Sequence, residues 1–205
     1  MNKRLANPSA LGFAGFAITL WMVSMINAGW FGANATQNID LMLAFAFGGT
    51  AMGIAGLMEY FRGRTLDMFL FLAFGAFWWA WALHAHSAAS ASMPATAGGY
   101  EGWFFLLWAV VAFYVWIASF RDGSARVLFT LGLWLSFLAL AIADWIDAPA
   151  FTVLGGYLGL ITALIGGYIS AADIINTSFE RVVLPTGEHE PGDHRDSATI
   201  DHAHA

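Results

Sequence analysis

Cysteine is absent from this chain of 205 residues, and charged side chains make up only 11% of it. Without cysteine the protein has no disulfide and no thiolate metal site in any compartment. Soluble domains carry roughly 25% charged residues, so this composition excludes an ordinary soluble domain. Lysine is nearly absent as well, because Lys3 is the only one, and a retinal Schiff base inside a span is therefore excluded. Hydrophobic residues account for 59%, which indicates an integral membrane protein.

The sequence contains six long apolar runs. The first begins at about Pro8, where a proline loses no hydrogen bond and Asn7 can cap the amides that follow. This run has no charged residue, and about twenty residues at about 1.5 Å each cross a hydrocarbon core of roughly 30 Å. Lys3 and Arg4 precede it, but it is too long for a signal peptide, so we expect it to be retained. We predict an all-α integral membrane protein with six spans, over about residues 8–30, 39–60, 66–83, 102–120, 125–143 and 150–175.

Positively charged residues occur only at alternate connections between the runs. They are Lys3, Arg4, Arg62, Arg64, Arg121, Arg126, Arg181 and Arg195. Because such residues near span ends prefer the cytoplasmic side, both termini are expected in the cytoplasm. Residues 1–183 are then the transmembrane domain. Residues 184–205, which are rich in acids, histidine, proline and glycine, are expected to form a disordered cytoplasmic tail.

Sequence motifs of enzymes are missing. The chain has no H-E-x-x-H, no G-x-S-x-G elbow, no phosphate-binding loop and no dinucleotide-binding turn. His84 and His86 are two residues apart and would not face each other on a helix, so we interpret them as loop histidines. The tail histidines His189, His194, His202 and His204 are interpreted as part of a solvated segment. We predict no catalysis, cofactor or metal site. The net charge of -6 falls largely in the tail and gives no reason to expect nucleic acid.

Polar side chains inside apolar spans usually face protein or a water-filled path. Ser24 and Asn27 lie three residues apart, so they share one face of the first span. Either they join helices by hydrogen bonds or they line a path. Glu59 lies three residues before Arg62, a spacing that favours an ion pair at the cytoplasmic edge over a proton relay.

Apolar residues at equal depth in the odd-numbered spans form a further candidate site. Phe16 lies eight residues beyond Pro8, and Phe74 eight beyond the start of the third span. Leu133 or Leu135 has the same depth in the fifth span, about 12 to 15 Å from its beginning. If these spans surround one axis, the three side chains meet as a hydrophobic constriction of the kind that gates by dewetting. Ordinary packing would give the same pattern.

Several segments are similar, in order, to those of the acetate uptake transporter family, which includes bacterial succinate-acetate permeases. Asn7-Pro8-Ser9-Ala10-Leu11-Gly12-Phe13 resembles the family signature N-P-A-P-L-G-L. Further matches are Gly15-Phe16, Asn27-Ala28-Gly29, Gly48-Gly49, Ala55-Gly56-Leu57-Met58-Glu59-Tyr60, Gly75 with Phe77-Trp78, Ala125-Arg126-Val127-Leu128 and Arg181-Val182-Val183-Leu184-Pro185. The resemblance extends over residues 5 to 188.

This resemblance implies six-helix protomers assembled as homohexamers, each with its own path for acetate, often with succinate, coupled to protons. It also implies a narrowest point made of a Phe, a Tyr and a Leu. Phe16 matches the Phe, whereas Phe74 stands at the Tyr position. The Leu falls on Leu135, or on Leu133 if a gap in the fifth span lies earlier. The ring would then be wholly apolar.

Three further departures from the family pattern remove or shorten hydrogen-bonding groups. Ala10 replaces a Pro of the signature, Met52 stands at a Gln position and Ser24 at an Asn position. A less polar path raises the free energy needed to dehydrate a carboxylate, so dicarboxylate transport is not expected here.

We therefore predict a transporter or channel for acetate and other short-chain monocarboxylates in a cytoplasmic membrane, proton-linked and in contact with membrane lipid. One alternative is a channel for small neutral solutes such as ammonia or carbon dioxide, which the apolar ring favours. Another is a membrane sensor or assembly protein whose tail recruits a cytoplasmic partner. Deletion of residues 186–205 would abolish function only under the last hypothesis.

Overall fold

The computed structural model describes residues 6–31, 38–90 and 96–187. Its elements are α1 (Ser9–Asn27), α2 (Asn38–Leu43), the π-helix η1 (Ala44–Ala51), α3 (Met52–Phe61), α4 (Thr65–Ala89), α5 (Tyr100–Ala118), the 3-10 turn η2 (Ser119–Arg121), α6 (Ser124–Ile146) and α7 (Pro149–Phe179). Six segments are long and apolar enough to cross a membrane, because α2, η1 and α3 together make one span over Ile39–Phe61. The predicted all-α fold with six spans is confirmed.

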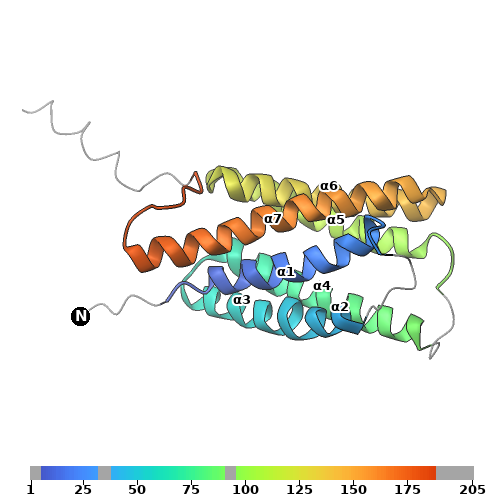
Figure 1. Cartoon of the computed structure of the whole chain (residues 1–205), viewed down its shortest axis with the longest axis horizontal. Coiled ribbons are helices and arrows are strands. Elements are labelled where there is room, and N and C mark those ends of the chain that lie inside the picture. Colours follow the sequence, from blue (N-terminus) through green and yellow to red (C-terminus); the bar gives the residue numbers. More distant parts are fainter. Residues whose placement is uncertain (1–5, 32–37, 91–95, 188–205) are drawn as a thin grey trace, which may run out of the picture.

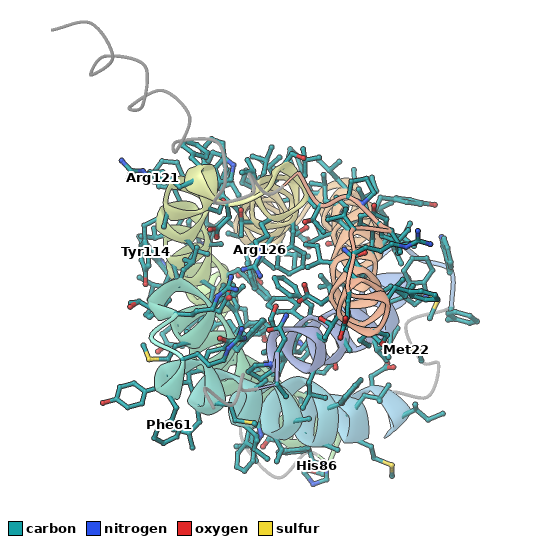
Figure 2. All side chains as sticks on the ribbon, turned by 90° about the vertical axis from the view of Figure 1, so that its left-hand side faces the viewer. Met22, Phe61, His86, Tyr114, Arg121 and Arg126 are labelled. Carbon is teal, nitrogen blue, oxygen red and sulfur yellow. The ribbon has the colours of Figure 1, made fainter. Side chains whose placement is uncertain are left out.

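The six spans lie side by side along one long axis (Figure 1). α1 packs along α7, α6 lies against both α5 and α7, and α4 packs on α3 and η1. Viewed along the long axis, the helices surround an interior filled with side chains (Figure 2). The largest buried side chains there are mostly aromatic and include Phe13, Phe16, Phe71, Phe74, Trp78 and Phe129.

Glycines on α7 set how closely this helix approaches α1. A Cβ added to Gly156 would lie 2.3 Å from the Ala28 amide nitrogen, and one added to Gly159 would lie 2.2 Å from the Ser24 hydroxyl oxygen. At Gly156 the two backbones meet at a distance that only glycine permits, and at Gly159 the Ser24 side chain occupies the space that a Cβ would take. This contact places Ser24 against α7.

The second span contains a π-helix that the sequence did not predict. In η1 the Thr50 hydroxyl donates to the Phe45 carbonyl oxygen over 2.7 Å. The small Gly48 lets this segment approach α1 and α4, since a Cβ there would lie 2.8 Å from Thr19 Oγ1 and 2.9 Å from Trp78 Cγ. π-helices are rare and are often found at functional sites.

The third span is longer than predicted. We expected it to end at Leu83 and a loop to hold His84 and His86, but α4 continues to Ala89 and carries both histidines. Alanine, which is frequent in this stretch, is the strongest helix former, so the helix continues where hydropathy falls. His84 Nε2 lies 3.1 Å from a carboxylate oxygen of Glu101 on α5.

All five arginines of the described residues lie at the end of the bundle where α1, α4 and α6 begin. They are Arg62, Arg64, Arg121, Arg126 and Arg181. We call this the arginine end. Lys3, Arg4 and Arg195 lie outside the described residues, and the cytoplasmic location of this end remains a prediction.

The first residues of the expected tail are attached to the bundle. The Ala125 amide donates to the Thr186 carbonyl oxygen over 3.1 Å, and the Tyr168 hydroxyl donates to the Pro185 carbonyl oxygen over 2.8 Å. Residues 184–187 thus return to the start of α6. The remainder of the tail, from 188 to 205 with all four of its histidines, lies outside the described residues.

Candidate functional site

A cavity of about 400 Å³ opens at the end of the bundle opposite the arginines. Residues of α1, α4, α5, α6 and α7 line it, so it lies between the helices rather than on one face. Its outermost lining residues include Asn27, Glu101, Asp147 and Thr152, which lie at or just beyond the helix ends on that side. A pocket of this size accommodates a small organic molecule together with water.

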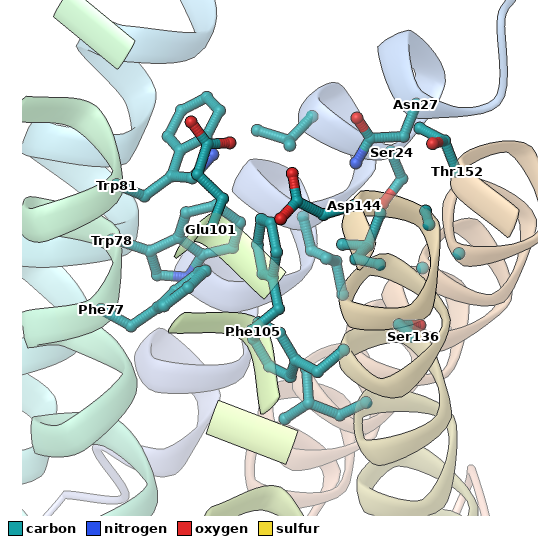
Figure 3. A pocket seen from close by; sticks show the side chains of 18 of the residues that line it. Ser24, Asn27, Phe77, Trp78, Trp81, Glu101, Phe105, Ser136, Asp144 and Thr152 are labelled. Carbon is teal, nitrogen blue, oxygen red and sulfur yellow. The ribbon is translucent and has the colours of Figure 1, made fainter. Parts of the chain in front are cut away.

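The mouth of the cavity is polar. Figure 3 shows Asn27 and Ser24 of α1 and Asp144 of α6 at this level, with Glu101 of α5 beside them. Asp144 Oδ2 accepts a hydrogen bond of 2.7 Å from the Gly102 amide, which fixes the carboxyl at the first turn of α5. Among the described residues that line the cavity, those with a formal charge are Glu101, Asp144 and Asp147. A solute at the mouth therefore meets negative charge and neutral hydrogen-bonding groups.

The floor of the cavity is apolar. Phe16 and Leu133 form part of it, and each is 1% exposed. The Phe16 ring centroid lies 5.4 Å from that of Phe74, 5.1 Å from Phe129 and 6.2 Å from Trp78. The cavity thus ends on a closely packed aromatic layer, which has no room for a hydrated ion.

The residues predicted from sequence fall into two groups. Phe16, Leu133, Ser24 and Asn27 all line the cavity. Phe74 does not, but it is fully buried directly behind Phe16.

Two other predicted residues lie away from the cavity. Leu135 is half-buried and is not among the residues that line it, because it lies two positions from Leu133 on α6 and so on another face. Glu59 is fully buried at the arginine end, where the Arg62 guanidinium donates to it over 2.9 Å. The predicted ion pair between Glu59 and Arg62 is therefore present.

Several lining residues were not predicted. Trp78 and Phe77 on α4, Phe137 on α6 and Glu101 on α5 surround the cavity with Phe16. The helical repeat could have identified two of them, since Trp78 lies four residues after Phe74 and Phe137 four after Leu133. Nothing in the sequence indicated that α5 contributes Glu101.

A network of charged side chains closes the arginine end. Buried Arg126 pairs with buried Asp67, and Arg64 Nε lies 2.7 Å from the other oxygen of the Asp67 carboxylate. The Ser9 hydroxyl donates to Asp173 over 2.7 Å. The signature residue Asn7 also belongs to this end, because its side-chain oxygen accepts from the Ser9 amide at 3.2 Å and from Arg62 at 2.6 Å.

Among the described residues, no group of three or more histidine, cysteine, aspartate or glutamate side chains is placed to hold a metal ion. A bundle of six spanning helices around a cavity with a polar mouth and an apolar floor defines a multi-pass membrane protein of the transport class. The GPR1/FUN34/yaaH family pattern matches residues 1–188, and the chain belongs to this family. The resemblance drawn from its sequence motifs is confirmed.

Several relatives of this chain are named as transport proteins. The succinate-acetate/proton symporter SatP of Escherichia coli (strain K12) is 29% identical over 187 residues, 91% of this chain and 98% of that protein. Acetate permease A of Emericella nidulans is 30% identical over 199 residues, 89% of this chain and 66% of the permease. Ammonia transport outward protein 3 of Saccharomyces cerevisiae is 28% identical over 179 residues, 85% of this chain and 65% of that protein.

A solved structure has the same fold. It is that of the bacterial acetate channel SatP, which matches with a TM-score of 0.85 and 28% sequence identity, over 90% of this chain and 100% of that one. The chain is thus a membrane transport protein and not an enzyme.

Proposed function

We propose that this protein carries acetate and other short-chain monocarboxylates across a cytoplasmic membrane. The observation that supports it most directly is a cavity that is polar at its mouth and ends on Phe16 and Leu133. Relatives named for acetate transport include the symporter, the permease and the channel described above. The cavity holds a small carboxylic acid easily, whereas the packed floor allows passage only to a solute that has lost its water.

In the proposed path the solute enters beside Asn27 and Ser24, which replace part of its hydration shell. It then loses the remaining water at Phe16, Phe74 and Leu133, and leaves at the arginine end. Dehydration of a carboxylate is costly without compensating hydrogen bonds, and a second carboxylate doubles that demand. The wholly apolar floor therefore favours monocarboxylates over succinate.

The acidic mouth supports a link to protons. Glu101, Asp144 and Asp147 repel an anion but do not repel its neutral acid. Their carboxyl groups are also sites at which a solute can take up a proton. We propose that the neutral acid, or the anion together with a proton, is the species that passes the floor.

Uptake by purified protein in proteoliposomes tests this function. Labelled acetate flux is measured at pH 5.5 and 7.5 against a panel of competing carboxylates, with protein-free liposomes as the control. We expect saturable flux that is faster at the lower pH, with competition by propionate and little competition by succinate. Flux no greater than that of empty liposomes at both pH values would contradict the proposal.

Ammonia is a second candidate solute. The apolar floor suits a small neutral molecule, and two Saccharomyces cerevisiae relatives are named ammonia transport outward proteins 2 and 3. Stopped-flow measurement of internal pH after an ammonium gradient and after an acetate gradient separates the two solutes. Acceleration by the protein in the ammonium experiment alone would favour the second candidate.

We also propose the homohexamer that the family resemblance implies. The outward face of α3 supports a contact with another protomer or with lipid, because Ile54, Leu57 and Phe61 are exposed there and Gly53 has open space beside it. Native mass spectrometry of the detergent-solubilised protein measures the number of chains directly.

A further inference from the structure

Arg126 is an arginine inside the bundle rather than at its surface. Its side chain is 4% exposed, whereas Arg121 of the preceding turn is exposed. Figure 2, seen from the arginine end, shows Arg126 among the side chains of the interior and Arg121 pointing away from the helices. The Arg126 guanidinium lies 5.2 Å from the centre of the Phe13 ring and donates to the Ser9 hydroxyl over 3.3 Å. Its ion-pair partners are the buried carboxylate of Asp67 and, at 4.0 Å, the carboxylate of Asp122, which is 30% exposed.

This guanidinium lies directly beyond the aromatic floor of the cavity. The Phe129 ring connects the two, since it lies 5.1 Å from Phe16 on one side and 5.2 Å from Phe13 on the other. Beneath that layer, next to Asp67 and Arg126, lies a cavity of about 10 Å³. A single water molecule needs about that much space, so this cavity is too small for a carboxylic acid. The charged groups that line this small cavity beyond the aromatic layer are Arg126, Asp67 and Asp122.

Opening this end requires that Arg126 and Asp67 separate. A buried guanidinium that loses its close counter-charge is destabilised, and Asp122 is farther away and partly exposed, so an anion that takes the place of Asp67 favours the separation. Asp67 would not be left unpaired, because Arg64, which is 38% exposed, already holds its second oxygen at 2.7 Å. The replacement must be a carboxylate or an anion of similar shape, since the planar fork of arginine matches that geometry.

We infer that Arg126 is a binding site for the carboxylate of the transported solute. The solute carboxylate exchanges with that of Asp67 on the Arg126 guanidinium, Asp67 stays with Arg64, and the exchange opens the arginine end. The choice of a monocarboxylate as ligand rests on the proposed function. The position of the site rests on the contacts of Arg126 with Asp67 and Phe13.

Chemical rescue tests this site without any flux measurement. Asp67→Ala removes the buried carboxylate that pairs with the Arg126 guanidinium, while Asp122 stays at 4.0 Å in both proteins. We expect sodium acetate to raise the thermal unfolding midpoint of purified Asp67→Ala by several degrees relative to sodium chloride of equal ionic strength, because a ligand that binds only the folded protein stabilises it. Acetamide, which has the shape of acetate without its charge, should have no effect. The double variant Asp67→Ala with Arg126→Gln should lose the response to acetate.

Equal midpoints in acetate and chloride for Asp67→Ala would overturn the inference, as would an acetate response that survives in the double variant. If Asp67→Ala does not fold, Asp67→Asn gives the same comparison, because it removes the charge and keeps the size. Flux provides the second measurement: Arg126→Gln should lower acetate flux about tenfold, whereas Arg121→Gln should leave it unchanged. Rescue by acetate with no acetate flux in the unsubstituted protein would retain the site and reject the proposed function.

Discussion

The ring of Phe16 on α1 lies 5.4 Å from the ring of Phe74 on α4, tilted by 54°. Phe16 forms part of the cavity floor, and Phe74 stands behind it, stacked at 6.0 Å on Phe137 of α6. Three helices therefore contribute to one aromatic layer. In the proposed path, a solute that has entered the cavity must displace this layer in order to continue.

Shortening Phe74 is expected to loosen the layer. Phe74→Ala should increase acetate flux in proteoliposomes several-fold, because it removes the ring that supports Phe16 from behind. The same change should lower the free energy of unfolding by about 3–5 kcal/mol, as is usual for a buried phenylalanine. Flux is therefore compared per amount of protein that elutes as a single symmetrical peak in size exclusion. Unchanged flux in folded Phe74→Ala would remove this residue from the path.

Two leucines on α6 provide a matched pair of substitutions. Leu133 lines the cavity, whereas Leu135 is half-buried on another face of the same helix. Leu133→Ala should widen the floor and speed the flux of acetate and of the bulkier propionate, and Leu135→Ala should leave both rates near that of the unsubstituted protein. Similar effects of the two substitutions would show that general loosening of α6, rather than the floor, controls transport.

Most of the fold could be predicted from the sequence because each span carries its own signal. An uninterrupted apolar run specifies a membrane helix without reference to any other part of the chain. Helix ends were harder to predict where hydropathy and helix propensity disagree. α4 continues through His84 and His86 because helix propensity stays high after hydropathy declines. The π-helix η1 was missed because it depends on close packing around Gly48, which involves residues of α1 and α4.

The cavity was predictable only in part, for a similar reason. Phe16, Phe74 and the leucines of α6 were predicted to line one path because they have equal depth along their helices. Depth, however, does not determine which way a side chain faces. The choice of Leu133 over Leu135 depends on the rotation of α6 about its axis. Asp67 and Arg126 are far apart in the sequence, and their pairing follows from tertiary packing alone.

Replacement of Gly159 should destabilise the contact between α1 and α7. A Cβ at this position would lie 2.2 Å from Ser24 Oγ and 3.1 Å from Ser24 Cβ, so Gly159→Ala should lower the thermal unfolding midpoint. Adding Ser24→Gly should recover much of that loss, since it removes both clashing atoms. Gly167→Ala on the same helix is the control, because the new Cβ would lie 3.9 Å from Ala17 Cβ, an ordinary van der Waals distance, and alanine favours helix by about 1 kcal/mol. Equal losses in Gly159→Ala and Gly167→Ala would contradict the packing argument.

Truncation after Gly187 should leave acetate flux unchanged. The described part of the C-terminal segment ends there, and it contacts the bundle through hydrogen bonds of Thr186 with Ala125 and of Pro185 with Tyr168. A control truncation after Arg181 removes these contacts and should lower the thermal unfolding midpoint. Loss of flux on removal of residues 188–205 alone would favour the sensor or assembly hypothesis, in which the tail recruits a partner.

We predict that stability depends on pH through the carboxyl group of Asp122, which lies in the turn between η2 and α6. Burial raises the pKa of its carboxyl above the ordinary value of 3.8, and this effect outweighs the opposing attraction of Arg126. The folded protein therefore holds this proton more tightly than the unfolded chain. Below both pKa values the group has no net effect, and stability falls as the pH rises through the interval between them.

Asp122→Asn removes this dependence. The variant should be more stable than the unsubstituted protein at pH 7.5, and the difference should shrink as the pH falls toward 4. Thermal unfolding midpoints of both proteins in detergent, measured at several pH values between 7.5 and 4, give this difference in stability. Asp147→Asn is the control for loss of one negative charge, because Asp147 is exposed at the opposite end and its left-handed backbone conformation (φ 49°) suits asparagine. An Asp122→Asn variant that is less stable than the unsubstituted protein at pH 7.5, with a deficit that disappears as the pH falls, would mean that Arg126 stabilises the ionised carboxylate more than burial disfavours it.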